Sequence, residues 1–420
     1  MKEKLSFIKL ITINTYSFGL SFLWNTLHPF VLPIILLKYV PAESKNTYLG
    51  LLTFFGLILA MLIQPLSGTL SDQLHCRWGK RTPFIALGTC LDIAVLILIA
   101  FSNSLLGIFV GYLALQITSN IAHGPTNALL ADFVPDKQKG LASGIKNFMD
   151  VFGAVVAALV VGFILKNEDA EDIPTFFTLI IILCISALIT LLSIHEKEDK
   201  KKTPRAQTEF SLKDVFHIDK ERDAPFVNLL IGRLVFLLGI NGVQTFAQYY
   251  IRDVLGGADP LKTTALFMIV ITVSLGVCVL LSGWFSDRIG AEKIMKIAML
   301  LTALGAFVLV FLRDVKLVLG VSALIGAGMG FYLTSNWAIA VKLAPHEQAG
   351  KFLGLTNLAT AGASALGRLE GPIVDLFNKF KGVSFLGYRF LFFICFLCSL
   401  ISFVMFQHLN NKIRNKERKM

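Results

Sequence analysis

Residues 68–83 read GTLSDQLHCRWGKRTP and form a short polar stretch between two apolar runs. An acidic residue lies near the end of the first run and basic residues precede the second, so opposite charges can pair and separate there. Two glycines would let neighbouring backbones approach closely. We therefore expect a loop between two helices that acts as a conformational gate, formed by Gly68, Asp72, Arg77, Gly79, Lys80 and Arg81.

The overall composition identifies the class of protein. Of 420 residues, 55% are hydrophobic and 16% are charged. The mean hydropathy is +0.69, far above the range of soluble proteins. One membrane crossing takes about 20 apolar residues, so a chain of this length has room for about twelve crossings joined by short loops. We predict an all-α integral membrane protein with 12 transmembrane helices.

Apolar runs bounded by charges, glycine or proline divide the chain accordingly. They fall at 8–38, 47–70, 83–102, 105–130, 141–165, 174–194, 225–251, 262–285, 291–312, 317–343, 350–376 and 384–408. The only long polar break is a charged connector that is too short to be a domain. The predicted domains are an N-terminal six-helix bundle, a cytoplasmic linker, a C-terminal six-helix bundle and a basic cytoplasmic tail, at 1–194, 195–224, 225–408 and 409–420.

The placement of the basic residues sets the topology. A net charge of +11 would also suit a nucleic-acid-binding protein, but Lys and Arg lie mostly in the loops, where they orient a membrane protein. With the N-terminus in the cytoplasm, most of the 39 basic residues fall on the cytoplasmic side. We expect both termini there, in a multi-pass protein of the plasma or inner membrane. The first apolar run is too long for a cleaved signal and is expected to remain as the first helix.

Two motifs occur twice, in the same order. The later copies lie 215 and 210 residues downstream: GTLSD at 68–72 returns as GWFSD at 283–287, and PDKQKG at 135–140 returns as PHEQAG at 345–350. A loop between helices 2 and 3 thus corresponds to one between helices 8 and 9, and a 4/5 loop to a 10/11 loop. This pattern predicts two parallel repeats of six helices. The second gate is then formed by Asp287 and Arg288.

Residues 68–83 resemble the loop between helices 2 and 3 of the major facilitator superfamily, and the repeats extend this resemblance over nearly the whole chain. The WGKRTP ending is most similar to the sugar:cation symporters, meaning the glycoside permeases and the sucrose:proton carriers. The resemblance implies that Asp72 caps the N-terminus of helix 11 and pairs with a nearby Arg, which holds the cytoplasmic side closed. The sequence departs from the family pattern at Gln73 and Glu292, so its second charge network is less regular.

Polar side chains gather on one face of helices 1, 4, 7 and 10, flanked by helices 5 and 11. Polar groups are expensive inside a bilayer, so such stripes indicate a central aqueous cavity. For any single amide, an interhelical hydrogen bond is the alternative. Amides beside aromatic rings suit a hydroxyl-rich ligand, because each desolvated hydroxyl needs a partner. The predicted substrate-binding residues are Trp24, Asn25, His28, Gln116, Asn120, His123, Asn241, Gln244, Tyr332 and Asn336.

Three ionisable residues inside apolar runs lie at similar depth, about nine residues from the cytoplasmic end of their helices: Asp92, Asp150 and Arg233. Arg233 could neutralise a carboxylate in one state and release it in another, as a proton carrier requires. A permanent buried ion pair is the alternative. Asp92 is alone on its helix and could simply be protonated and hydrogen-bonded.

Helix 11 and two histidines supply the other candidates for ion coupling. Arg368 and Glu370 point to nearly opposite sides of their helix unless Gly371-Pro372 bends the backbone. His28 and His123 could carry protons or serve as polar residues of the cavity wall. The predicted ion-coupling residues are Asp92, Asp150, Arg233, Arg368 and Glu370.

The predicted function is secondary active transport by alternating access, in which a proton gradient drives a small polar solute such as a sugar or glycoside. The sequence contains no nucleotide-binding loop and no catalytic or metal-ligand constellation, so we expect no enzyme activity, cofactor or metal. The expected partners are the solute, a coupling cation (H⁺ or Na⁺) and membrane lipids, without nucleic acid, and the chain is expected to be a monomer. The alternatives are an exporter of amphipathic compounds, a carrier of a pigment or lipid-like ligand, and a non-transporting sensor that signals through 195–224.

Overall fold

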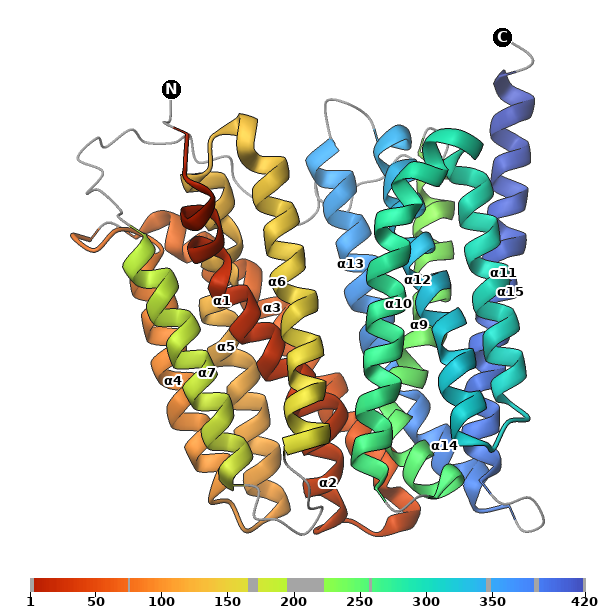
Figure 1. Ribbon diagram of the computed structural model, residues 1–420, viewed down its shortest axis with the longest axis horizontal. Helices are drawn as coiled ribbons and strands as arrows, with labels where there is room; N and C mark the ends of the chain where they lie inside the picture. The colour runs from red at the N-terminus through yellow and green to blue at the C-terminus, as the bar shows by residue number, and fades with distance from the viewer. Residues whose placement is uncertain are drawn as a thin grey trace. The chain divides into compact units, whose positions relative to one another are not determined.

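The computed structural model describes residues 4–74, 76–164, 173–194, 223–256, 259–344, 349–380 and 385–417. Within these ranges every regular element is a helix and no strand occurs (Figure 1). The first half of the chain forms α1 (Phe7–Thr26), η1 (Leu27–Val31), α2 (Leu32–Leu37), α3 (Lys45–Gln73), α4 (Thr82–Ala100), α5 (Leu105–Phe133), α6 (Lys139–Leu159) and α7 (Ile173–Ser193). The second half forms α9 (Ala224–Tyr250), α10 (Pro260–Ile289), α11 (Ala291–Leu309), α12 (Val315–Leu343), α13 (Ala349–Arg368), α14 (Glu370–Asn378) and α15 (Leu386–Glu417).

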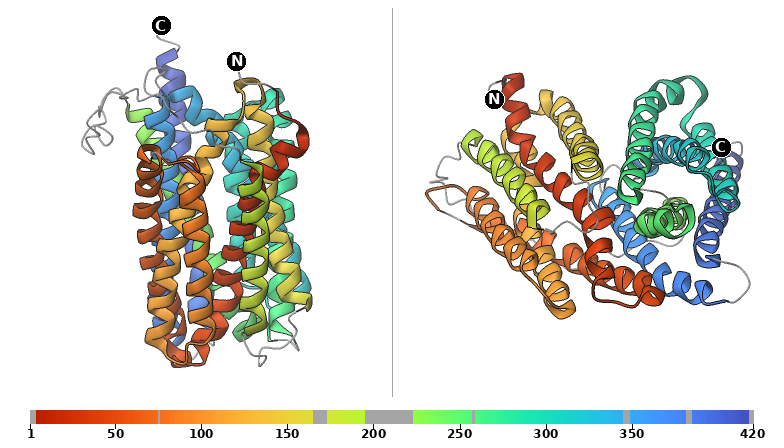
Figure 2. Two further views of the ribbon diagram at one scale, coloured as in Figure 1. Left: turned by 90° about the vertical axis from the view of Figure 1, so that its left-hand side faces the viewer. Right: turned by 60° about the horizontal axis from the view of Figure 1, so that its bottom comes forward.

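The chain divides into two compact units. The N-terminal unit comprises Met1–Lys202 and Asp259–Ala265, and the C-terminal unit comprises Thr203–Ala258 and Leu266–Met420. Each is a bundle of long helices that run side by side, as two further views show (Figure 2). Most of the predicted linker lies outside the described residues. Most of the predicted tail is part of α15, which continues as a helix to Glu417.

The long helices have the composition of membrane spans. Among the described residues, 10 helices are long and apolar enough to cross a bilayer. The other two apolar runs form α11, which has Glu292, Lys293 and Lys296 near its start, and the pair α13 and α14, which is interrupted at Leu369. A helix satisfies its own backbone hydrogen bonds, which an apolar environment requires. The structure confirms the all-helical membrane fold, and the count of twelve crossings stays a prediction.

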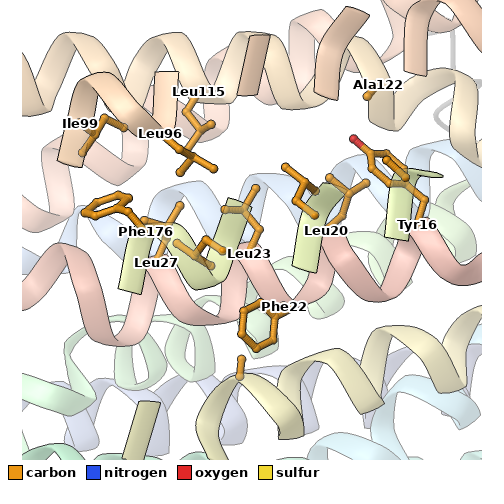
Figure 3. Packing of buried hydrophobic residues seen from close by; sticks show 14 of the residues in the cluster. Tyr16, Leu20, Phe22, Leu23, Leu27, Leu96, Ile99, Leu115, Ala122 and Phe176 are labelled. Carbon is orange, nitrogen blue, oxygen red and sulfur yellow. The ribbon is translucent and has the colours of Figure 1, made fainter. Parts of the chain in front are cut away.

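An apolar core holds the N-terminal unit together. Side chains from α1, η1, α4, α5 and α7 meet in one layer (Figure 3): Tyr16, Leu20, Leu23, Leu27, Leu96, Ile99, Leu115, Ala122 and Phe176. Between membrane helices the gain comes mainly from close packing, which favours small residues at contacts. At Gly88 an added Cβ would lie 2.8 Å from the backbone nitrogen of Ala122, so this glycine lets α4 and α5 touch.

Two helices contain local irregularities that proline explains. The first helix passes through a π-helical turn, η1, which contains Pro29 and presents His28. In the eleventh run, α13 ends at Arg368 and α14 begins at Glu370. Pro372 has no N–H to donate, and its ring clashes with the carbonyl four residues earlier, that of Arg368. The predicted bend at Gly371-Pro372 is therefore centred slightly earlier, at Leu369.

The predicted repeat is visible in the helices themselves. α5 and α12 are both 29 residues long, and each begins after a capping side chain, Ser104 or Asp314, 210 residues apart. The six buried positions of α4 likewise fall on buried positions of α11 when shifted by 210 residues. This register pairs Asp92 with Thr302 and Thr118 with Gly328. The two units thus share one pattern of helix lengths, caps and buried positions, which we call the helical plan, and they differ in the side chains at those positions.

Candidate functional site

The N-terminal unit brings three of the predicted substrate-binding residues together around Tyr112. Trp24 stacks on His28, with ring centroids 5.1 Å apart and an interplanar angle of 27°. His28 Nε2 lies 2.9 Å from the hydroxyl of Tyr112, and Gln116 Nε2 donates to the same hydroxyl at 2.7 Å. We call Trp24, His28, Tyr112 and Gln116 the aromatic–amide cluster.

Tyr112 was missed by the sequence analysis. It lies one helical turn before Gln116 on α5 and is fully buried. Extending the polar face of that helix by one turn would have included it. Tyr112 matters because its hydroxyl joins the imidazole of His28 to the amide of Gln116 and so fixes the two groups relative to each other.

The other predicted residues of the N-terminal unit take separate positions. Asn120 is buried and donates to the carbonyl of Gln116 at 2.7 Å. Asn25 is exposed and donates to the carbonyl of Ser21 at 2.9 Å. His123 is half-buried on α5, and no described residue of this unit hydrogen-bonds its ring. The structure therefore groups these three residues less tightly than the aromatic–amide cluster.

The C-terminal unit has a second polar cluster around a buried arginine. Arg233 of α9 donates from Nε to Thr360 Oγ1 at 2.9 Å and from Nη1 to Asn336 Oδ1 at 2.6 Å. Asn336 Nδ2 donates in turn to the hydroxyl of Tyr332 at 3.3 Å. The ring of Tyr332 stacks on Phe236 with centroids 3.8 Å apart. We call Arg233, Tyr332, Asn336 and Thr360 the arginine cluster, of which Thr360 was not predicted.

Asn241 and Gln244 lie farther along α9. Asn241 Oδ1 accepts from Ser364 Oγ at 3.0 Å, and its Nδ2 donates to the carbonyl of Leu237 at 2.7 Å. This is the interhelical hydrogen bond that the sequence analysis left open as an alternative for single amides. Gln244 Nε2 lies 4.0 Å from the sulfur of Met329, a weak acceptor.

Two buried carboxyl groups have incomplete sets of partners. Asp92 accepts from Thr118 through Oδ1, and its Oδ2 has no hydrogen-bond partner among the described residues. Glu370 is 4% exposed, and neither of its carboxyl oxygens has a partner in the described part of the chain. An added Cβ on Gly242 of α9 would collide with the Glu370 carboxyl, so the two helices meet there. An ionised carboxylate in such surroundings costs several kcal/mol. Both side chains are therefore candidates for reversible protonation.

The remaining ion-coupling candidates have closer partners. Lys146 Nζ lies 3.0 Å from Asp150 Oδ2, one turn away on α6. Arg368 Nη1 donates to the carbonyl of Ser364 at 2.6 Å. The helix is interrupted between Arg368 and Glu370, so their expected positions on opposite sides of one continuous helix stay a prediction. The expected neutralisation of a carboxylate by Arg233 in one state, and its release in another, stays a prediction.

The gate loop forms a charge network within the N-terminal unit. Arg81 is 3% exposed, and its guanidinium bridges Asp72 and Asp132, with Nε 2.8 Å from Asp132 Oδ2. Lys80 Nζ lies 3.1 Å from the same Asp132 oxygen and 3.8 Å from Asp72. Asp132, at the end of α5, was missed because the motif was examined only within 68–83. The charges of the motif could have indicated a further acidic partner, because its single aspartate cannot balance three basic residues.

The two gate glycines differ in their roles. A Cβ added at Gly68 would meet nothing within 4 Å, whereas one added at Gly124 of α5 would lie 3.0 Å from the backbone nitrogen of Gly68. The backbones of α3 and α5 therefore approach closely at Gly68, and Gly124 is the glycine that allows it. Gly68 contributes its carbonyl, which accepts from Arg81 at 3.3 Å. Gly79 has a φ of 89°, which disfavours side chains, and its N–H donates to the carbonyl of Cys76 at 3.0 Å. Arg77 lies beside the Trp78 ring, 5.6 Å from its centroid.

The second gate motif is described only in part. The guanidinium of Arg288 lies over the ring of Trp284, 3.8 Å from its centroid. The side chain of Asp287 lies outside the described residues, so its expected pairing stays a prediction. The expected capping of helix 11 by Asp72 also stays a prediction.

Comparison with known proteins identifies the family of this chain. Residues 7–367 match the sequence profile of the Major Facilitator Superfamily. Multidrug resistance protein MdtG of Dickeya zeae (strain Ech586) is 23% identical over 357 residues, covering 81% of each chain. Human solute carrier family 45 member 4 is 25% identical over 214 residues, covering 46% of this chain and 27% of that protein.

Solved structures share the fold at low sequence identity. The nucleoside transporter NupG is 14% identical, with a TM-score of 0.74 over 96% of this chain and 98% of NupG. A POT family transporter has the same TM-score and identity over 97% of this chain and 99% of its own. These relatives are transporters, which supports in general terms the prediction that the chain is not an enzyme. As the gate loop and the internal repeat predicted, the chain is a multi-pass membrane protein that belongs to the major facilitator superfamily.

Proposed function

We propose that this chain is a proton-coupled secondary active transporter that moves a small polar solute, such as a sugar or glycoside, by alternating access. The observation that carries the proposal is the aromatic–amide cluster of the N-terminal unit. It combines an indole face, an imidazole, a phenol and an amide on α1, η1 and α5. The internal repeat and the charged gate loop supply the two-unit construction that alternating access requires.

The chemistry of this cluster suits a hydroxylated ring. Removing each hydroxyl of a sugar from water costs free energy unless a protein group replaces the lost hydrogen bond. Gln116 and Tyr112 already bond to each other, so a solute hydroxyl can exchange with that bond and leave both groups satisfied. Trp24 is only half-buried, and its ring offers an apolar face on which a pyranose can stack.

The coupling proton is assigned to Glu370. Its carboxyl group is buried against α9 without a hydrogen-bond partner among the described residues. It begins α14, directly after the interruption at Leu369, where the backbone can flex. Asp92 is the second choice because Thr118 already holds one of its oxygens. A proton moving down about 150 mV supplies roughly 3.5 kcal/mol, enough for several hundredfold accumulation of the solute.

The remaining features of the proposal concern the membrane and the gate. We place the chain in the inner or plasma membrane with both termini in the cytoplasm and the monomer as the working unit. The ion pairs of Arg81 with Asp72 and Asp132 give the gate loop a defined closed form. The gate would open and close as Asp72 exchanges partners between the loop and the second half of the chain.

A second candidate function is export of amphipathic compounds. It is favoured by the similarity to proteins named multidrug resistance protein MdtG, which extends over 81% of the chain. The same scaffold serves both purposes, because direction and substrate depend on the site and not on the fold. The narrower resemblance of the WGKRTP motif to sugar:cation symporters favours the first candidate.

Reconstitution separates the two candidates. The purified chain is placed in proteoliposomes with a trapped pH-sensitive dye, and mono- and disaccharides are added under proton or sodium gradients. We expect a saccharide-triggered pH change in the wild type that is lost in Gln116→Leu, which removes the amide at similar volume. Thr178→Ala is the control, because Thr178 is half-buried on α7 and its hydroxyl bonds only within its own helix. Extrusion of an amphipathic dye, with no response to any saccharide, would establish the exporter instead.

A further inference from the structure

We propose that Arg233 forms an anion-binding subsite, so that the transported solute carries a carboxylate or a phosphate beside its hydroxyl groups. This rests on the proposed function, because it assumes that the solute reaches the arginine cluster. It narrows the substrate class from neutral sugars to acidic ones, such as sugar acids or sugar phosphates.

The argument begins with the surroundings of the guanidinium. Arg233 is 6% exposed, and its two described hydrogen bonds go to the neutral oxygens of Asn336 and Thr360. Within the described residues of the C-terminal unit, no carboxylate forms an ion pair with it. Asn336 in turn donates to the hydroxyl of Tyr332, which is also neutral. A buried cation with only neutral partners is the reverse of the usual arrangement, in which buried charges are paired.

The guanidinium also retains capacity for a ligand. Nε and Nη1 donate to protein groups, and Nη2 donates to no described residue of this unit. A planar guanidinium binds carboxylate or phosphate oxygens through directed, charge-assisted hydrogen bonds, which are stronger than neutral ones. A bound anion would therefore supply both the missing charge and the missing acceptor.

The internal repeat shows which residues of the N-terminal unit correspond to the surroundings of Arg233. The motifs at 135–140 and 345–350 set a register of 210 residues between α6 and α13. In this register Lys146 corresponds to Thr356, and Asp150 corresponds to Thr360. The N-terminal unit thus holds a Lys–Asp ion pair where the C-terminal unit holds two threonines. Thr360 is the residue that accepts from Arg233, so the C-terminal unit has a hydroxyl where the N-terminal unit has a carboxylate.

The test measures anion binding by thermal unfolding of the purified chain in lipid nanodiscs. The probes are D-glucuronate, glucose 6-phosphate and inorganic phosphate, with glucose as the neutral comparator at matched ionic strength. We expect stabilisation by D-glucuronate, glucose 6-phosphate or both, and a smaller effect of glucose. Comparing glucuronate with the two phosphates shows which anion the subsite prefers. Phosphate alone, without its sugar ester, would report an adventitious ion only and would overturn the proposal.

Four variants test whether the anion binds at Arg233. Arg233→Gln removes the charge and is expected to weaken anion binding at least about tenfold. Thr360→Asp places a carboxylate beside the guanidinium and is expected to weaken it similarly, whereas Thr360→Asn changes the side chain without adding charge and is expected to weaken it less. Lys342→Gln is the matched control, because it removes a positive charge from an exposed side chain of the same unit.

Three further results would overturn the proposal. These are equal stabilisation by glucose and by the anions, retention of anion binding in Arg233→Gln, and no response of the wild type to any anion. Its failure is distinguishable from that of the proposed function. Proton-coupled uptake of a neutral sugar that survives Arg233→Gln refutes the anion subsite alone. Anion binding that depends on Arg233, without coupled uptake, refutes the transport mechanism alone.

Discussion

The two units differ in the partners of their buried arginines and of several carboxyl groups. In the N-terminal unit, Arg81 is paired with two aspartates and Lys146 with Asp150. In the C-terminal unit, Arg233 has only neutral partners and Glu370 has none among the described residues. Paired charges can remain in place through the transport cycle. A buried charge without a counter-ion is instead neutralised when a proton or an anion binds, and this binding is reversible. In our proposal, the paired charges of the first unit serve the gate, and Glu370 and Arg233 of the second unit bind the proton and the anionic group.

The shared helical plan makes this contrast informative. Asp92 and Thr118 of the first unit correspond to Thr302 and Gly328 of the second, where Thr302 bonds to the carbonyl of Ala298 at 3.0 Å. The fold therefore forms without an acid at this position. Ionisable residues that appear in only one unit are not required by the helical plan, which is why we assign them to function.

The largest expected effect follows from Arg81→Met, which breaks the gate network of the N-terminal unit. The change removes the buried cation that Asp72 and Asp132 share and leaves them only Lys80. We expect a loss of about 3 kcal/mol, at the low end for a broken buried pair, because Asp72 is 52% exposed. Unfolding in micelles measures it. A loss below about 0.5 kcal/mol, the scale of a surface ion pair, would show that this network does not stabilise the unit.

Gly242→Ala tests the contact between α9 and the Glu370 carboxyl in the C-terminal unit. The added methyl group would collide with that carboxyl, so we expect a loss of about 2 kcal/mol from overpacking. Combining it with Glu370→Ala should recover part of the loss, because the shorter side chain makes room. Purely additive losses in a double-mutant cycle would contradict the contact.

Asp92→Thr gives the N-terminal unit the same residue type that the C-terminal unit has at the equivalent position, Thr302. Because Thr302 occupies the equivalent position in an intact helix pair, we expect the variant to fold, with a stability change within about 1.5 kcal/mol. Its unfolding transition is compared with that of the wild type. A variant that fails to fold would show that Asp92 is structural and would remove it from the candidates for proton coupling.

Arg233→Met is expected to have the smallest effect, with a sign opposite to that of Arg81→Met. Replacing a buried charge that lacks a counter-ion by an apolar side chain of similar length is neutral or stabilising, by up to about 1 kcal/mol in the absence of ligand. The same unfolding assay compares the two arginines directly. A large loss from Arg233→Met would indicate a hidden counter-charge and would weaken the contrast between the units.

Much of the fold could be predicted from the sequence. The apolar runs at 83–102 and 317–343 match α4 and α12 to within two residues at each end. Inside a bilayer the backbone must satisfy its own hydrogen bonds, so hydropathy alone locates the helices. The π-helical turn at Leu27–Val31 was not predicted, because it depends on how proline is accommodated within one helix.

The candidate site could be predicted only in part, for a physical reason. A helical face can be read from one helix, so Trp24, His28 and Gln116 were identified on two helices. The partners that organise each cluster come from neighbouring helices or adjacent turns. Tyr112, Asp132 and Thr360 are such partners, and helical periodicity does not tell which faces meet across helices.

The most direct test of the central claim compares the acids of the two units in one transport assay. Solute-driven proton uptake is measured in proteoliposomes containing the wild type, Glu370→Gln or Asp150→Asn, each checked for folding. We predict that Glu370→Gln abolishes proton uptake while solute exchange continues, and that Asp150→Asn retains coupled uptake at a reduced rate. Normal coupling in Glu370→Gln, with coupling lost in Asp150→Asn, would contradict the division of roles between the two units.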